Sequence, residues 1–178
     1  MRPNNVSYVQ YFIIDTCVWR HAEEGDLDSL MLLAIIGKRC EYKIVVDKDR
    51  EILREYRKVF GKNWIANKIF SKIAGRDKIL DREKAPLEFV RECVLSYVGM
   101  TEFDESDIKF LQVAVKVPNP IIISKDTRSF LRLRERIKQV KIKHKHLPRA
   151  IKDLKILTPE EAVGRLLKVL SLSSQQLY

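Results

Sequence analysis

Short apolar runs alternate along this chain with longer segments whose apolar positions recur every three to four residues. Residues 11–15, 42–46 and 121–124 form runs that are rich in β-branched residues and end sharply, which is typical of buried parallel strands. Residues 155–157 make a shorter run that predicts an edge strand. Strands that alternate with helices predict an α/β fold, here a three-layer α/β/α domain with a central, mainly parallel sheet of about four to five strands.

Helical periodicity fills the intervals between these strands. The predicted helices cover residues 28–37, 49–60, 63–74, 86–97, 106–117, 127–140 and 159–170. Asp26 or Asp28 is the expected N-cap of the first helix, and Gly61 ends the second. Thr158 and Glu161 have the spacing of a capping box at the start of the last helix.

The remaining segments set the expected extent of the domain. Residues 76–85 are polar and charged without clear periodicity, so they predict a mobile loop. Residues 171–178 predict a frayed end. We therefore expect one domain over residues 1–178, with its core between about residues 11 and 170.

The composition is that of a soluble globular protein, with 46 % hydrophobic and 33 % charged residues among 178. The longest apolar run, residues 30–36, is too short to span a bilayer, and the N-terminus lacks the apolar core of a signal peptide. These features predict a cytoplasmic protein with no membrane partner. Cys17, Cys40 and Cys93 have no C-x-x-C spacing, which favours three reduced, mostly buried thiols over a zinc site.

Positive charge is concentrated in one part of the chain. The net charge is +10, and residues 127–155 alone hold eleven Lys or Arg against two acidic residues, a net charge of +9. A one-signed, local excess favours a nucleic-acid partner over a salt-laced surface of the kind found in thermophile proteins. His144 and His146 alternate within an expected extended segment and are assigned to this basic surface. The candidate phosphate contacts are Lys125, Arg128, Arg132, Arg136, Lys141 and Lys143.

Two of the apolar runs end in an aspartate, Asp15 and Asp126. Ligands of open α/β sheets bind beyond the carboxyl ends of the strands, so two such carboxylates predict a negatively charged pocket. On a basic chain, this pocket suggests metal-assisted attack on nucleic acid. Each position also has a purely structural interpretation: Asp15 as an Asx turn and Asp126 as the N-cap of a helix that begins near Thr127.

Each of the two further acidic positions has two candidate residues, and spacing alone does not choose between them. Glu51 and Glu55 lie one turn apart on the same predicted helix and share a face. Asp104 and Asp107 stand at the start of another helix. Asp104 is the better N-cap, which leaves Asp107 in the first turn.

Five stretches of the chain, in order, resemble the motifs of the PIN domain, a small metal-dependent ribonuclease fold. They are residues 12–16 (FIIDT), 52–56 (ILREY), 107–114 (DIKFLQVA), 121–126 (IIISKD) and 156–161 (ILTPEE). The resemblance selects Glu55 over Glu51 and places the third acid at Asp107. Two departures stand out: the segment 61–99 is longer than in a minimal domain of this kind, and the segment 141–146 has no recognised counterpart.

The resemblance implies a site in which Asp15, Asp107 and Asp126, helped by Glu55, hold Mg²⁺ or Mn²⁺. A metal-activated water would then attack an RNA phosphodiester in line. Ser124 and Thr16 would orient the carboxylates or waters of the site without touching the ion. The implied activity is that of an endoribonuclease, either an RNA-processing enzyme or the toxin of a toxin–antitoxin pair.

Other functions and partners are also compatible with this pattern. The alternatives are a catalytically inactive module that binds RNA or protein, and a structure-specific DNA nuclease. The resemblance further implies a homodimer, with the apolar helices over residues 28–37 or 63–74 as candidate faces, and an antitoxin-like protein as a possible partner.

Overall fold

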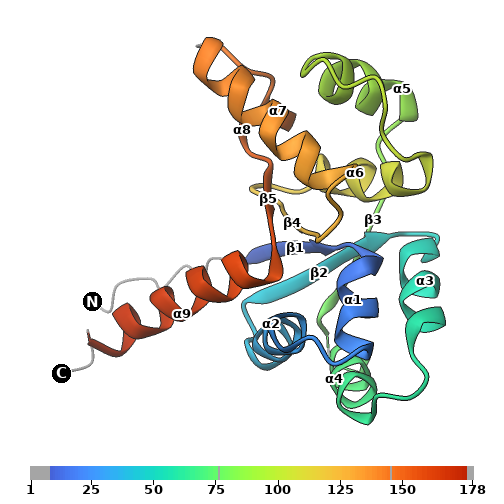
Figure 1. Ribbon diagram of the computed structural model, residues 1–178, viewed down its shortest axis with the longest axis vertical. Helices are drawn as coiled ribbons and strands as arrows, with labels where there is room; N and C mark the ends of the chain where they lie inside the picture. Colours follow the sequence, from blue (N-terminus) through green and yellow to red (C-terminus); the bar gives the residue numbers. More distant parts are fainter. Residues whose placement is uncertain (1–8, 76, 145, 176–178) are drawn as a thin grey trace, which may run out of the picture.

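The computed structural model describes residues 9–75, 77–144 and 146–175, and its centre is one five-stranded sheet (Figure 1). All strand pairs are parallel, and the order across the sheet is β3-β2-β1-β4-β5. The strands are β1 (Gln10–Ile14), β2 (Tyr42–Asp47), β3 (Ile79–Arg82), β4 (Ile121–Ile123) and β5 (Lys155–Leu157). This sheet confirms the expected α/β fold.

Helices cover both faces of the sheet, which gives three layers (Figure 1). One layer contains α1 (Thr16–Glu23), α2 (Leu27–Lys38), α3 (Glu51–Val59), α4 (Trp64–Ala74) and α9 (Pro159–Gln175). The other contains α5 (Leu87–Val90), the π-helix η1 (Arg91–Ser96), the 3-10 helix η2 (Glu105–Asp107), α6 (Ile108–Ala114), α7 (Phe130–Lys143) and α8 (Arg149–Lys152). None of the described helices is long and apolar enough to cross a membrane.

The strand interiors explain why the sheet lies in the middle of the fold. Phe12, Ile13 and Ile14 of β1 pair with β4 on one side, while β2 pairs on the other, and all three side chains are buried. Strands buried on both faces read as continuous apolar runs, as they do here. The same runs made these strands predictable from the sequence.

Several helix ends follow the expected capping chemistry. The Asp26 carboxylate accepts the Ser29 N–H at 3.0 Å and caps α2, which decides between Asp26 and Asp28. At the start of α9, the Thr158 N–H donates to Glu161 at 2.9 Å and the Glu161 N–H donates back to Thr158 Oγ1 at 3.3 Å. This reciprocal pair is the predicted capping box.

The structure corrects the sequence analysis at two segments near the sheet. The expected loop over residues 76–85 contains β3, whose exposed or half-buried Ile-Leu-Asp-Arg sequence suits a charged edge strand but lacks an alternating pattern. No element was predicted over residues 16–23, where α1 buries Val18, Trp19 and Ala22. Trp19 is completely buried and packs edge-on against Phe60 and Phe70, and this packing anchors the short helix in the core.

The last third of the chain also differs from the expectation. The helix predicted over residues 127–140 is α7, which is shifted toward the C-terminus and includes Lys141 and Lys143. The expected extended segment therefore begins only at His144, and Lys145 lies outside the described residues. The final helix continues beyond residue 170 to Gln175, and residues 1–8 and 176–178 also fall outside the described part.

The three cysteines are free thiols, as expected, but they are less buried than predicted. Cys40 is exposed, and Cys17 and Cys93 are half-buried. Cys40 lies in the turn before β2, where no layer covers it.

The strand order creates one position at which the connections diverge. From β1 the chain proceeds outward through β2 to β3, and it then returns to the other side of β1 to form β4 and β5. The connections that follow the carboxyl ends of the neighbouring strands β1 and β4 therefore run in opposite directions across the sheet. In open parallel sheets this switch point is where the crevice for ligands forms.

Candidate functional site

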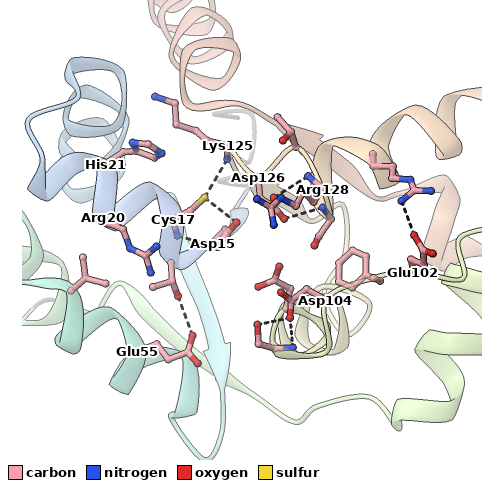
Figure 2. A pocket seen from close by; sticks show the side chains of 18 of the residues that line it. Asp15, Cys17, Arg20, His21, Glu55, Glu102, Asp104, Lys125, Asp126 and Arg128 are labelled. Carbon is pink, nitrogen blue, oxygen red and sulfur yellow. Dashed lines mark hydrogen bonds and ion pairs between the residues drawn. The ribbon is translucent and has the colours of Figure 1, made fainter.

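A cleft with a volume of about 1440 Å³ lies at the carboxyl ends of β1 and β4. Its lining comes from Asp15 and α1, the second half of α3, residues 102–107, the turn between β4 and α7, and the first turn of α7. Figure 2 shows Asp15 and Asp126 between two walls, with Arg20 and Glu55 on one and Glu102 and Arg128 on the other. All four predicted acids line this cleft.

Asp15 follows β1 directly and is 4 % exposed. One carboxylate oxygen accepts the Cys17 N–H at 3.1 Å and caps α1, so the Asx-turn geometry is present. The other oxygen accepts the Ser124 hydroxyl at 2.5 Å and the Cys17 thiol at 3.0 Å. These contacts fix the orientation of a carboxylate that the sheet places at the bottom of the cleft.

Asp126 is fixed in the same way beyond β4. Its two carboxylate oxygens accept the N–H groups of Arg128 and Ser129, both at 2.9 Å. Bonds to the N–H groups two and three residues ahead are the pattern of an N-cap, as the structural interpretation of Asp126 predicted, although residues 127–129 form a turn and α7 begins at Phe130. The Ser124 hydroxyl accepts the Asp126 N–H at 2.9 Å, so this one hydroxyl connects Asp15 with the backbone of Asp126.

Asp107 enters the cleft from the opposite layer, at the end of η2. The Asp104 carboxylate accepts the Ser106 N–H at 2.8 Å and caps η2, so Asp104 is the N-cap of this pair. Burial, followed by the negative charges of Asp15, Asp104 and Asp126, raises the pKa of Asp107 from 3.8 to about 7, while the Ser129 hydroxyl opposes the change. Asp107 thus experiences the accumulated negative charge of the site.

Glu55, on α3, is in a different electrostatic situation. One of its carboxylate oxygens accepts the Thr16 hydroxyl at 3.1 Å, and the other lies 2.5 Å from the Lys109 ammonium. Lys109 is 8 % exposed and also lies 3.9 Å from Glu51. The charge of Glu55 is therefore balanced by a buried cation of the protein itself.

The donor set fits a hard divalent cation in its chemistry. Mg²⁺ and Mn²⁺ prefer carboxylate oxygens, and the three aspartates supply such oxygens from both layers around one cleft. Within the described ranges, however, no three His, Cys, Asp or Glu side chains are grouped closely enough to surround an ion directly. An ion at this site would therefore keep several waters between itself and the protein, as Mg²⁺ commonly does.

Cations line both walls of the cleft. Arg128 and Arg132 lie on the α7 wall, where Arg132 pairs with Glu102 at 3.4 Å. Lys125 also lines the cleft, but its ammonium is held by Asp26 at 2.8 Å. The other three predicted phosphate contacts do not reach the cleft. They lie exposed along α7: Arg136, Lys141 and Lys143.

Sequence reasoning did not identify four residues that shape the site. Arg20 and Lys58 supply the positive charge of the second wall, and both stand on helix surfaces where the sequence shows only a solvated charge. Asp47 ends β2 as Asp15 ends β1, and its buried carboxylate caps α3 through the N–H of Ile52 at 2.8 Å. Lys109 is a lone charge within the apolar sequence of α6, which is the one signal that marks it.

Cys17 also lines the cleft, beside Asp15. Burial, together with the adjacent Asp15 charge, raises the pKa of its thiol to about 12. The thiol is therefore protonated at neutral pH and acts as a hydrogen-bond donor to Asp15.

The chain matches no protein-family model, and a search of curated proteins finds no significant match. The resemblance to the PIN domain therefore continues to rest on the five sequence motifs.

Proposed function

We propose that this protein is a metal-dependent endoribonuclease of the PIN-domain type. The observation that carries the proposal is the convergence of Asp15, Asp107 and Asp126 on one cleft, where burial and repulsion from the other two aspartates together raise the pKa of Asp107 to about 7. Carboxylates that repel one another destabilise an empty site and favour a bound cation. A folded chain that maintains this repulsion at a sheet switch point has the features of a catalytic centre.

Each acidic residue has a distinct part in the proposed reaction. Asp15, Asp107 and Asp126 would hold Mg²⁺ or Mn²⁺, partly through water, and the ion would supply an activated water and charge neutralisation. Asp107 must be ionised to act as a ligand, so metal affinity should rise as pH increases through about 7. Ser124 keeps Asp15 in place, and Thr16 does the same for Glu55.

The dimensions and charges of the cleft favour a polymeric substrate. Its volume of about 1440 Å³ exceeds the roughly 300–1,000 Å³ that is usual for small-molecule pockets. Arg20 and Lys58 on one wall face Arg128 on the other, across the acidic floor. Cationic walls would hold the phosphates of a strand while the acids and the ion act on one phosphodiester.

Cleavage of labelled single-stranded RNA tests the proposal. Wild type, Asp107→Asn and Asp49→Asn are compared in Mn²⁺, Mg²⁺ and EDTA; Asp49 is an exposed acid outside the cleft and serves as the matched control. We expect metal-dependent cutting that falls more than about 100-fold in Asp107→Asn, because even outer-shell partners of metal ligands change activity 10–100-fold. Asp49→Asn should cleave like wild type.

The same experiment separates the competing functions. RNA that is bound but never cut, with or without metal, would indicate a catalytically inactive binding module. A substrate panel that includes single-stranded and flap DNA, with cutting confined to DNA, would indicate a DNA nuclease. Cutting that persists in EDTA would exclude the proposed mechanism.

The proposed protein partners concern a different surface. Leu27 and Met31 of α2, and Trp64 and Ile65 of α4, are exposed apolar side chains on the two helices that the sequence nominated. A homodimer or an antitoxin-like partner would bury them. Sedimentation of the purified chain, alone and with candidate partners, tests both predictions.

A further inference from the structure

Lys109 is a buried ammonium group at the edge of the acidic site. It lies on α6, two residues after Asp107, and is 8 % exposed between the buried side chains of Ile108 and Phe110. Burying a charged group is costly unless it is paired with good geometry. The position is therefore explained only by the groups that the ammonium contacts.

The ammonium lies 5.5 Å from the centre of the Phe110 ring, and its ion-pair partners are two glutamates of α3. The Lys109 ammonium lies 2.5 Å from Glu55 and 3.9 Å from Glu51. Glu51 has a second partner, Lys84, at 3.1 Å. Two glutamates and two lysines thus form a charge-balanced group beside the aspartates of the cleft.

The Glu55 carboxylate is occupied on both oxygens, by the Thr16 hydroxyl and by the Lys109 ammonium. Asp107 differs, because no cation is an ion-pair partner of its carboxylate in the part of the chain that the structure describes. A divalent ion that approached Glu55 would meet the positive charge of the Lys109 ammonium, 2.5 Å from one carboxylate oxygen.

We propose that Lys109 is a built-in cation that takes the place of a second divalent ion, so that the site binds one ion on Asp15, Asp107 and Asp126 and none on Glu55. The inference rests on the proposed metal-dependent function. It makes Lys109 and Glu55 positioning residues: the pair joins α3 to α6 and holds the wall opposite Asp126.

The charge of the site supports a single ion. Without Lys109, the four carboxylates would carry four negative charges, which balance two divalent ions. With Lys109 this group of five side chains keeps three negative charges, and a second ion would leave the group positive. In a partly buried cleft that excess repels the second ion strongly, because Coulomb interactions are weakly screened there.

Counting bound Mn²⁺ tests the inference without any activity assay. Titration calorimetry, with electron paramagnetic resonance of free Mn²⁺, is applied to wild type, Asp107→Asn, Glu55→Gln, Lys109→Met and the Glu55→Gln/Lys109→Met double variant. We expect one ion in wild type, loss of binding in Asp107→Asn, and a change within about threefold in Glu55→Gln, whose carboxylate is not a ligand. Lys109→Met frees Glu55 and should bind a second ion, and the double variant should bind one.

The contrary results are equally distinct. Two ions in wild type, a loss in Glu55→Gln as large as that in Asp107→Asn, or Lys109→Met with wild-type stoichiometry would each overturn the inference while leaving a metal nuclease in place. A wild-type protein that binds no Mn²⁺ would overturn the proposed function, and this inference with it. If Lys109→Met does not fold, the comparison of Glu55→Gln with Asp107→Asn still decides.

Discussion

The acidic cleft has two sides whose electrostatic situations are opposite. On the aspartate side, the charges of Asp15 and Asp126 act on Asp107 and contribute to raising its pKa to about 7. On the glutamate side, Glu55 carries the same charge but is paired with Lys109 at 2.5 Å. Both sides line one cleft and would look alike in a list of acids. The comparison teaches that the partner of a carboxylate, as well as the carboxylate itself, sets how much uncompensated negative charge the cleft presents.

The first prediction concerns the contact that connects the two strand ends, and after Asp107→Asn it has the largest expected effect. Ser124→Ala removes the hydroxyl that donates to Asp15 and accepts from the Asp126 backbone. Mn²⁺ affinity should fall by about 10–100-fold, the usual cost of losing an outer-shell partner. Titration calorimetry measures the affinity, with Ser71→Ala, an exposed serine of α4, as the control. An unchanged affinity would mean that the aspartates do not need this support.

The second prediction concerns the stability of the glutamate side. Lys109→Met leaves Glu55 without its cation and should destabilise the fold by roughly 2 kcal/mol, less than the 3–5 kcal/mol of a fully buried pair, because the Glu55 side chain is 31 % exposed. The Glu55→Gln/Lys109→Met double variant removes both charges and should recover most of this loss. Urea unfolding measures both, and additive effects in the double variant would show that the two residues are not coupled.

The third prediction concerns the pH dependence of stability that the aspartate side should cause. Because the folded pKa of Asp107 is raised from 3.8 to about 7, the metal-free protein should lose stability as pH rises from about 4 through 7. Asp107→Asn should lack this loss and be more stable than wild type above pH 7. Thermal unfolding across this range in EDTA measures the effect. A wild-type profile that parallels Asp107→Asn would contradict the repulsion among the aspartates.

The smallest effect is expected at the wall of the cleft. Arg20→Gln should weaken RNA binding only a few-fold and reduce the slope of log K against log salt by about 1, as expected for one lost phosphate contact. Fluorescence anisotropy in an Asp107→Asn background measures binding without cleavage. Arg54→Gln, an exposed arginine of α3 outside the cleft, is the control. Equal slopes for the two variants would show that Arg20 does not contact an RNA phosphate.

The central sheet was accessible from sequence because its strands are local and strongly patterned. The apolar runs that became β1, β2 and β4 are buried on both faces, and Asp15 and Asp126 mark their ends. β3 was missed because an edge strand with Asp81 and Arg82 has no apolar pattern to read. The N-cap interpretation of Asp126 was confirmed by its bonds to Arg128 and Ser129, but the start of α7 was placed three residues too early.

The site was predictable only in part, for a related reason. Spacing could not choose between Glu51 and Glu55, and the resemblance to the PIN domain made that choice. The ion pair between Glu55 and Lys109 joins residues 54 positions apart, so no local pattern indicates it. Contacts of this kind depend on how α3 and α6 come together across the cleft, which is known only once the fold is known.

The most direct test of the account is the rate of Mn²⁺-dependent cleavage of single-stranded RNA by wild type, Asp107→Asn and Glu55→Gln. The account predicts cutting by wild type, a loss of more than about 100-fold in Asp107→Asn, and a loss of less than about tenfold in Glu55→Gln. Equal losses in the two variants would contradict the proposal that the aspartates hold the ion and Glu55 does not. Absence of cutting by wild type in either Mn²⁺ or Mg²⁺ would contradict the proposed function.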